Sequence, residues 1–172
     1  MLQLKNLIDD HLQGALSGQT LDVFAPATGE VYAQVPRSQA EDVQLALAAA
    51  QAAQPEWQAL SPEARGALFF RLADLIDTHH QRLAEAESLD TGKPLSLAYQ
   101  LDIPRAAQNL RFFGGALQHT SQNAHSRPGF LNYTLHQPVG IGVCISPWNL
   151  PLYLLTWKIA PALAAGNCVL AK

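Results

Sequence analysis

The chain has 172 residues, of which 48% are hydrophobic and 15% are charged, and this composition excludes the disordered class of protein. The formal net charge of -3 provides no concentrated positive surface for phosphates, so we expect no nucleic-acid partner. Neither of the two cysteines has CxxC or disulfide-framework spacing, and the N-terminus has no apolar run of signal-peptide length. We therefore expect a reducing, cytoplasmic location.

The first third of the chain predicts short strands followed by a helix. Residues up to about Gly18 form a short amphipathic start. Two alternating runs, 21–24 and 30–35, flank a turn-rich centre and predict a hairpin. Ser38 to Glu41 has the form of a capping box, so a helix should begin there. Pro55 should end that helix near Gln54, because proline removes a helical hydrogen bond.

Three more helices are predicted before residue 120. Ser61-Pro62 is a start signal with proline in the first turn, and the helix after it carries one apolar stripe. The stripe consists of Leu68, Leu72, Leu75 and Ile76. A further helix over about 81–89 should close near Gly92. Another should cover roughly 103–117.

The pattern changes after residue 120. A β-rich run over 130–136 follows Pro128-Gly129, and a second extended, apolar run covers 139–146. A helix should open after Asn149, with Leu152, Leu155, Ile159 and Leu163 on one face. Gly166-Asn167 is a typical helix end, and residues 168–171 predict a buried strand.

Residues 138–172 are strongly apolar, and composition alone leaves three interpretations. A membrane hairpin would need about 20 apolar residues in a row, and Pro147, Asn149, Pro151 and Pro161 interrupt the run. A plain buried strand–helix–strand unit would explain only the apolar content. A strand–turn–helix that presents a polar side chain also explains Asn149, a lone amide that needs partners if it is buried. We favour the third interpretation and expect no membrane partner.

Several motifs in one order give the chain a family resemblance. The segment 138–172 resembles the aldehyde dehydrogenase family through Pro147-Trp148-Asn149 with Pro151, Trp157-Lys158, Pro161-Ala162-Leu163, Gly166-Asn167 and Ala171-Lys172. Upstream, the family signatures are resembled by Pro26-Ala27-Thr28-Gly29-Glu30, Asp90-Thr91-Gly92-Lys93-Pro94 and the tract from Arg111 to Gly115. The likeness covers about residues 21–172.

The resemblance implies an α/β fold, namely the N-terminal part of the aldehyde dehydrogenase fold. Helices and hairpins would lead into an incomplete Rossmann-like parallel sheet. Residues 1–120 would form the helical and hairpin part of the cofactor-binding domain, 121–138 an oligomerisation β-ribbon, and 139–172 the start of the NAD-binding α/β core. A homo-oligomer, dimer or tetramer, would be the full-length state.

The resemblance also assigns roles to single residues. Asn149 matches the family's oxyanion-hole asparagine, whose amide donates to the substrate oxygen when a cysteine thiolate attacks the aldehyde. A helix N-cap is the alternative role for an asparagine at this place. Lys158 matches a lysine near the active site. Asp102 occupies a position that in some members helps to bind a structural cation.

Two sets of residues would surround the ligands. The cofactor, NAD with NADP as an alternative, would lie beside Ile145, Ser146, Pro147, Trp148 and Lys172, the lysine hydrogen-bonding the ribose hydroxyls. The aldehyde channel would be lined by Leu150, Tyr153, Leu154 and Trp157, for which core packing is an equal alternative. Cys144 lies in an apolar run with no nearby base, so we interpret it as a packed strand thiol and not a nucleophile.

The chemistry implied is oxidation of an aldehyde to a carboxylic acid through a cysteine thioester. The family's nucleophilic cysteine and general-base glutamate lie downstream of residue 172, so we expect this chain alone to be inactive and poorly stable. It is either a truncated reading of a longer enzyme or a short remnant. Residues 145–157 look most like those of the hydroxymuconic and aminomuconic semialdehyde dehydrogenases of aromatic-ring breakdown. A betaine- or aliphatic-aldehyde enzyme and a non-catalytic interaction module are the alternatives.

Overall fold

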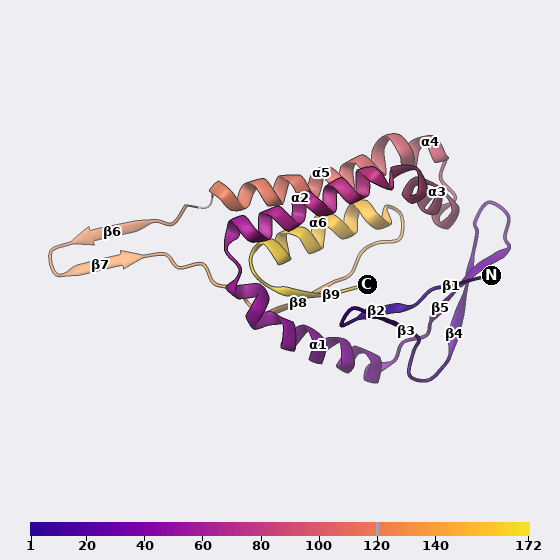
Figure 1. The fold of residues 1–172 in the computed structure, drawn as a ribbon, viewed down its shortest axis with the longest axis horizontal. Coiled ribbons are helices and arrows are strands. Elements are labelled where there is room, and N and C mark those ends of the chain that lie inside the picture. The colour runs from indigo at the N-terminus through magenta and orange to yellow at the C-terminus, as the bar shows by residue number, and fades with distance from the viewer. Residues whose placement is uncertain (120) are drawn as a thin grey trace.

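The computed structural model describes residues 1–119 and 121–172. Thr120, where the first predicted part ends, lies outside the described residues. Figure 1 shows a body of packed helices with short strands at one end and a two-stranded ribbon projecting from the other. The chain is thus a mixed α/β structure, as predicted.

The N-terminal region contains five strands. They are β1 (Leu2–Gln3), β2 (Asn6–Ile8), β3 (His11–Gln13), β4 (Thr20–Phe24) and β5 (Val31–Pro36). β4 and β5 pair antiparallel, which confirms the predicted hairpin, and β1 adds to β5 in parallel. The start of the chain is itself a hairpin of β2 and β3. Asp9 and Asp10 form its two-residue turn, both with positive φ, a conformation that short polar side chains tolerate.

Helix α1 (Ala40–Ala59) differs from its prediction at both ends. The capping interaction is one residue later than expected, because the carboxylate of Asp42 accepts from the backbone N–H of Gln39 at 2.8 Å. The helix continues through Pro55. Side chains near the proline tie α1 to the C-terminal unit, since Trp57 Nε1 donates to the Leu163 carbonyl at 3.0 Å and Gln54 Nε2 to the Gly166 carbonyl at 2.9 Å. These contacts help to offset the hydrogen bond that proline removes.

The helical body follows α1. Its elements are α2 (Pro62–Thr78), α3 (His80–Thr91), α4 (Leu95–Leu97), the π-helical turn η1 (Ala98–Asp102), α5 (Ile103–Ala116) and the short 3₁₀ turn η2 (Leu117–His119). Ser61 caps α2 by accepting from the N–H of Ala64, as predicted. Gly92 ends α3 with φ of 73°, the left-handed conformation expected of a glycine helix end. The π-helical turn was not predicted.

The apolar stripe predicted for α2 is confirmed at Ile76 and wrong at its three leucines. Leu68, Leu72 and Leu75 are exposed, and the buried residues are Gly66, Phe69, Ala73 and Ile76. The buried face is set by α5, which approaches so closely that a Cβ on Gly66 would lie 2.9 Å from the carbonyl oxygen of Gly114. Small residues permit this approach, whereas leucines at the same contact would hold the helices apart.

The ribbon consists of β6 (Ala124–Arg127) and β7 (Phe130–Tyr133), which pair antiparallel across a two-residue turn. Every residue of both strands is exposed. The ribbon lies within the segment 121–138 that we predicted to serve in oligomerisation, and that role stays a prediction.

The C-terminal unit is a strand–helix–strand arrangement. β8 (Ile141–Cys144) and β9 (Cys168–Ala171) pair in parallel, and α6 (Pro151–Ala164) connects them. Gly166 follows the helix with φ of 86°, consistent with the predicted helix end. The face of α6 toward the core carries Thr156, Ala160 and Ala164, with Leu152 and Leu163 packed beside them, so the predicted leucine face is only partly buried.

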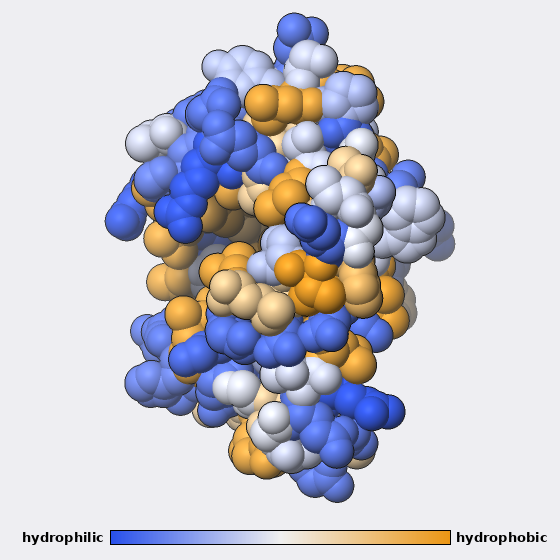
Figure 2. Space-filling view, turned by 90° about the vertical axis from the view of Figure 1, so that its right-hand side faces the viewer, coloured by the Kyte–Doolittle hydropathy of each residue, from blue (hydrophilic) through white to orange (hydrophobic). Residues whose placement is uncertain are grey.

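Apolar side chains are exposed at several places on this chain. Figure 2 views the end with the N-terminal strands and shows hydrophobic residues around a hollow at the left of the view. Leu2, Leu7, Leu12 and Phe24 of these strands are more than half exposed. Within the described residues, no helix has both the length and the apolar character needed to cross a bilayer.

Candidate functional site

The predicted cofactor residues meet at one edge of the parallel strand pair. Ile145 and Ser146 follow the carboxyl end of β8, and Lys172 follows that of β9. The backbone N–H of Ser146 donates to the Lys172 carbonyl at 2.6 Å, and the N–H of Lys172 donates to the Cys144 carbonyl at 2.8 Å. Ligands of open α/β sheets bind outside the carboxyl ends of the strands. The chain therefore brings these three residues together where a nucleotide would be expected.

The turn that carries Asn149 leads from this edge into α6. Pro147, Trp148 and Asn149 are all exposed in this chain, Trp148 to 83%. The N-cap position of α6 belongs to Leu150, and the helix has no side-chain cap. No hydrogen bond of the Asn149 side chain is found among the described residues, so the N-cap alternative has no support here. The amide remains available to donate to another group.

A buried cluster of charges lies behind this turn. The Lys93 ammonium is 2.5 Å from Asp102 Oδ2 and 3.3 Å from Glu87 Oε1, and it donates to the backbone carbonyl of Asn149 at 3.0 Å. The side chain of Asp102 is 0% exposed, that of Glu87 4% and that of Lys93 11%. Farther along the chain, Glu87 Oε2 accepts from the N–H of Leu152 at 3.4 Å. The cluster thus contacts the turn at two points.

Burial shapes the electrostatics of the cluster. It raises the pKa of the Glu87 carboxyl, and the nearby Lys93 ammonium and the Leu152 N–H oppose that rise. Asp102 Oδ1 has no hydrogen-bond partner among the described residues, so Lys93 alone compensates this buried carboxylate. Removal of the lysine would leave two uncompensated acids in the interior.

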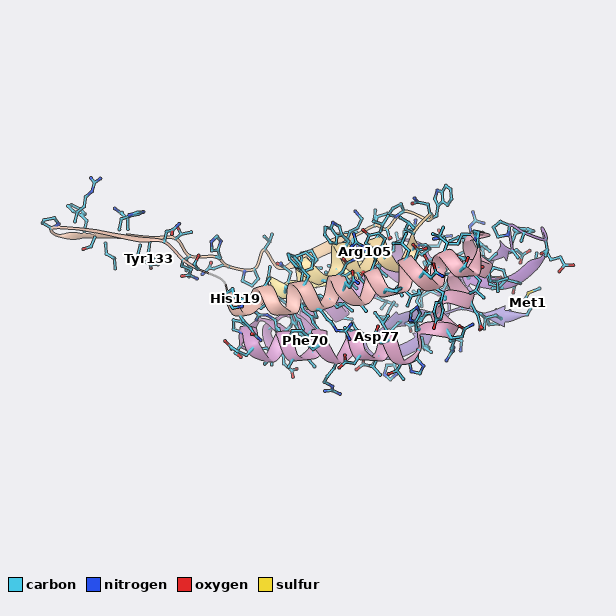
Figure 3. The ribbon with its side chains drawn as sticks, turned by 90° about the horizontal axis from the view of Figure 1, so that it is seen from above. Met1, Phe70, Asp77, Arg105, His119 and Tyr133 are labelled. Carbon is cyan, nitrogen blue, oxygen red and sulfur yellow. The ribbon has the colours of Figure 1, made fainter. Side chains whose placement is uncertain are left out.

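The four predicted channel residues lie outside the buried core. Leu150, Tyr153 and Leu154 are half-buried and Trp157 is half exposed. The Arg105 guanidinium of α5 lies 5.6 Å from the centre of the Tyr153 ring, at the junction of α5 and α6 in Figure 3. Phe113 meets Trp157 edge to face at 6.0 Å. Tyr153 and Trp157 thus form an aromatic face on α6 toward α5.

Three further predictions concern single residues. Cys144 is buried at the end of β8, consistent with a packed thiol. Lys158 is exposed on α6, and no ion pair of its side chain occurs in the described part of the chain. At Asp102 an ammonium already occupies one oxygen, and no group of three acidic, histidine or cysteine side chains suited to a metal occurs in the described ranges. The arrangement lends no support to a cation at Asp102.

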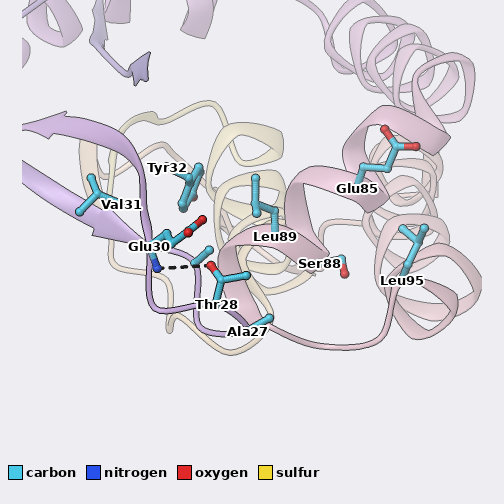
Figure 4. Close-up of a pocket in the computed structure, with 10 residues that line it drawn as sticks. Ala27, Thr28, Glu30, Val31, Tyr32, Glu85, Ser88, Leu89 and Leu95 are labelled. Carbon is cyan, nitrogen blue, oxygen red and sulfur yellow. Dashed lines mark hydrogen bonds between the residues drawn. The ribbon is translucent and has the colours of Figure 1, made fainter.

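A pocket of about 460 Å³ lies elsewhere, between the turn of the β4–β5 hairpin and α3. Figure 4 shows Thr28, Tyr32 and Leu89 among its lining residues. The Tyr32 hydroxyl donates to Asp90 at 2.6 Å, and burial together with this carboxylate raises the pKa of Tyr32 to about 12. None of the predicted site residues lines this pocket.

The sequence profile of the aldehyde dehydrogenase family matches residues 14–172. The chain therefore belongs to the aldehyde dehydrogenase family. Its relatives include the 2-aminomuconic semialdehyde dehydrogenase of Bos taurus, 51% identical over all of this chain, and the 2-hydroxymuconic semialdehyde dehydrogenase of Pseudomonas sp. strain CF600, 40% identical. These alignments cover 35% and 37% of the two relatives, so the chain spans about a third of their length.

Solved structures agree with the sequence comparison. One crystal structure is of PnpE in complex with nicotinamide adenine dinucleotide, and another is of PnpE from Pseudomonas sp. WBC-3. Each matches 99% of this chain with a TM-score of 0.95 and 40% identity. The match covers 35% of each PnpE chain. Asn149 and its neighbours are thus exposed in a chain that corresponds to about one third of a PnpE chain.

The charge cluster was not predicted from the sequence. Lys93 was part of a predicted motif, and Glu87 was not among the predicted site residues. One signal was present: Glu87 follows Ala84 at helical spacing on the inner face of α3, where a charged residue needs a partner. The third member of the cluster, Asp102, lies in the interior because of the π-helical turn, and sequence periodicity does not reveal such a turn.

Proposed function

We propose that the protein to which this chain belongs oxidises an aldehyde to a carboxylic acid with NAD⁺, through a cysteine thioester. The observation that carries the proposal is the meeting of Ser146, Lys172 and the Asn149 turn at the carboxyl edge of β8 and β9. The family membership and the similarity to PnpE, solved with nicotinamide adenine dinucleotide, support it.

The chain's residues fit a nucleotide at this edge. The Lys172 side chain is exposed, so its ammonium can donate to ribose hydroxyls. Ile145 and Trp148 present exposed apolar surface beside it. When bound, the nicotinamide would accept the hydride, with its electron pair, that leaves the former aldehyde carbon as the oxyanion collapses to the thioester. Water would then hydrolyse the thioester to the acid and the free thiol.

In the proposed mechanism, Asn149 acts when a cysteine thiolate outside this chain attacks the aldehyde carbon. The carbonyl π electrons move to oxygen as the carbon–sulfur bond forms, and the Asn149 amide N–H donates to that negative oxygen. One such donor contributes about 2.7–4 kcal/mol to transition-state stabilisation. The part of the aldehyde molecule beyond its carbonyl group would contact Tyr153, Leu154 and Trp157. We keep Lys158 as a nearby lysine with no assigned step.

We further propose a semialdehyde of aromatic-compound catabolism as the substrate class, supported by relatives that are 40% and 51% identical. A cytoplasmic location is proposed from the two unpaired, buried cysteines. A dimer or tetramer is proposed as the assembly, since the ribbon exposes Phe130, Leu131 and Tyr133.

The experiment joins residues 1–172 to the remaining two-thirds of the bovine relative, and we call this protein the completed enzyme. It should reduce NAD⁺ with 2-aminomuconic semialdehyde as substrate, and more efficiently than with betaine aldehyde or a long-chain aldehyde. The same measurement on the 172-residue chain should give no NADH. A folded completed enzyme that reduces no NAD⁺ with any aldehyde would overturn the proposal.

A second candidate function is a non-catalytic interaction module. The fully exposed ribbon favours it, because two exposed strands with apolar side chains can pair with another chain. Size-exclusion chromatography of the 172-residue chain with a full-length relative tests this function. Co-elution would support it, and separate elution would exclude it.

A further inference from the structure

We propose that Lys93 is a positioning residue, and that the buried Glu87–Lys93–Asp102 cluster clamps the Trp148–Leu152 turn so that the Asn149 amide keeps its place. The functional part of this inference rests on the proposed oxyanion role of Asn149. The mechanical part concerns only contacts within this chain.

One cluster contacts the turn at two points. Lys93 Nζ donates to the Asn149 carbonyl at 3.0 Å, and that carbonyl shares a peptide plane with the N–H of Leu150. Glu87 Oε2 accepts from the N–H of Leu152 at 3.4 Å. The two contacts lie three residues apart, so together they restrict both the position and the tilt of the turn.

Before Leu152, which packs against the core, the turn has few other restraints. Its residues 147–149 are exposed, and the start of α6 lacks a side-chain cap. The hydroxyl of Ser146 contributes only long contacts, 3.4 Å to the Pro147 carbonyl and 3.3 Å to the Pro151 carbonyl. Exposed backbone with few buried contacts opens readily, so the charge cluster is the main restraint on residues 147–149.

The Lys93 ammonium is itself held by two buried carboxylates. Asp102 is completely buried on η1, and its 2.5 Å contact fixes the ammonium to the helical body. Glu87 holds it from α3. A charge fixed by two buried partners is a rigid donor, whereas a free lysine side chain would lose much rotamer entropy on binding the turn.

The test uses hydrogen–deuterium exchange of the 172-residue chain. In Lys93→Met, the amide of Leu152, whose N–H donates to Glu87, should exchange about tenfold faster or more, while the amides of α5 change by less than about twofold. Lys5→Met, which removes an exposed lysine, is the matched control and should leave every amide unchanged. Unchanged exchange in the turn of Lys93→Met would overturn the proposal, as would a wild-type turn that is no better protected than an unfolded peptide.

Lys93→Met leaves two buried acids without a cation and can unfold the chain, so a second variant is needed. Glu87→Gln/Lys93→Met/Asp102→Asn removes all three charges while keeping the side-chain volumes similar. It should also free the turn while α5 stays protected. A folded triple variant with a fully protected turn would show that the ammonium does not hold it.

Kinetics of the completed enzyme separate this inference from the proposed function. The triple variant should lose about a hundredfold in kcat with KM nearly unchanged, because a displaced oxyanion donor acts only in the transition state. Normal kcat together with a freed turn would overturn the positioning role. If the completed enzyme without these substitutions is inactive, the proposed function is contradicted. The hydrogen-exchange result then decides alone whether the cluster holds the turn.

Discussion

The helical body and the ribbon both carry apolar side chains, yet they differ in where these side chains lie. In the body, Ile103 and Leu110 of α5 are completely buried against α2 and α6. In the ribbon, Phe130, Leu131 and Tyr133 are all more than half exposed, and Figure 3 shows Tyr133 far from the helices. The body buries its apolar side chains within the chain, whereas the ribbon can bury its own only against another surface. Stability should therefore depend on the body and association on the ribbon.

The largest stability effect should come from the body. Leu110→Ala removes a completely buried side chain and leaves a cavity between α2, α5 and α6, so it should cost about 2–5 kcal/mol of unfolding free energy. Urea denaturation followed by circular dichroism measures the change. A cost below about 0.5 kcal/mol would mean that this core is not packed as described.

The close approach of α2 and α5 provides the next effect. Gly66→Ala places a Cβ 2.9 Å from the Gly114 backbone carbonyl, and the helices must separate, at a cost of about 1–3 kcal/mol. Gly115→Ala is the matched control, because a Cβ there meets nothing within 4 Å. In an α-helix this control should instead stabilise by about 0.5–1 kcal/mol. Equal effects of the two substitutions would contradict the described contact.

A smaller effect should appear at the junction of α1 with the N-terminal strands. Backbone N–H groups of Gln39 and Leu16 donate to Asp42 and lower the pKa of its carboxyl. As pH falls, the Asp42 carboxyl of the unfolded chain therefore binds a proton at a higher pH than that of the folded chain. The stabilisation from these two hydrogen bonds is fully present above the ordinary aspartate pKa and is lost as pH falls through the lowered pKa of Asp42. Asp42→Asn should lower the melting temperature at pH 7 and reduce the further fall in melting temperature toward acid pH. Glu41→Gln should do neither. Thermal melts between pH 2 and pH 7 would measure both, and parallel curves for wild type and Asp42→Asn would contradict this assignment.

The smallest stability effect should come from the ribbon. Leu131→Ala removes exposed surface only, so unfolding free energy should change by no more than about 0.5 kcal/mol. The same substitution should weaken self-association of the completed enzyme, measured by sedimentation. Loss of stability without any change in association would reverse the roles assigned to body and ribbon.

The sequence predicted what local signals specify. The β4–β5 hairpin, the Ser61 cap, the glycine that ends α3 and the order strand–helix–strand at the C-terminus all follow from turn and cap residues, and the structure has them. The site could be placed because its motif residues lie close together in the chain. Ser146 and Lys172 are brought together by the parallel pairing of two short strands.

What depends on distant partners could not be predicted. The α2 stripe was misplaced because α5, and not the leucine spacing, decides which face is buried. Pro55 did not end α1, because Trp57 and Gln54 find acceptors about 110 residues away in sequence. Lys93 could not be linked to Asn149, since their contact spans 56 residues and requires the π-helical turn to bury Asp102.

The most direct test of the central claim is the turnover number of Asn149→Ala in the completed enzyme. Loss of the amide that donates to the aldehyde oxygen should lower kcat by about 10²–10³-fold. Asn132→Ala, the same substitution on the exposed ribbon, should leave kcat unchanged. If Asn149→Ala turns over as fast as Asn132→Ala, Asn149 is not the oxyanion donor.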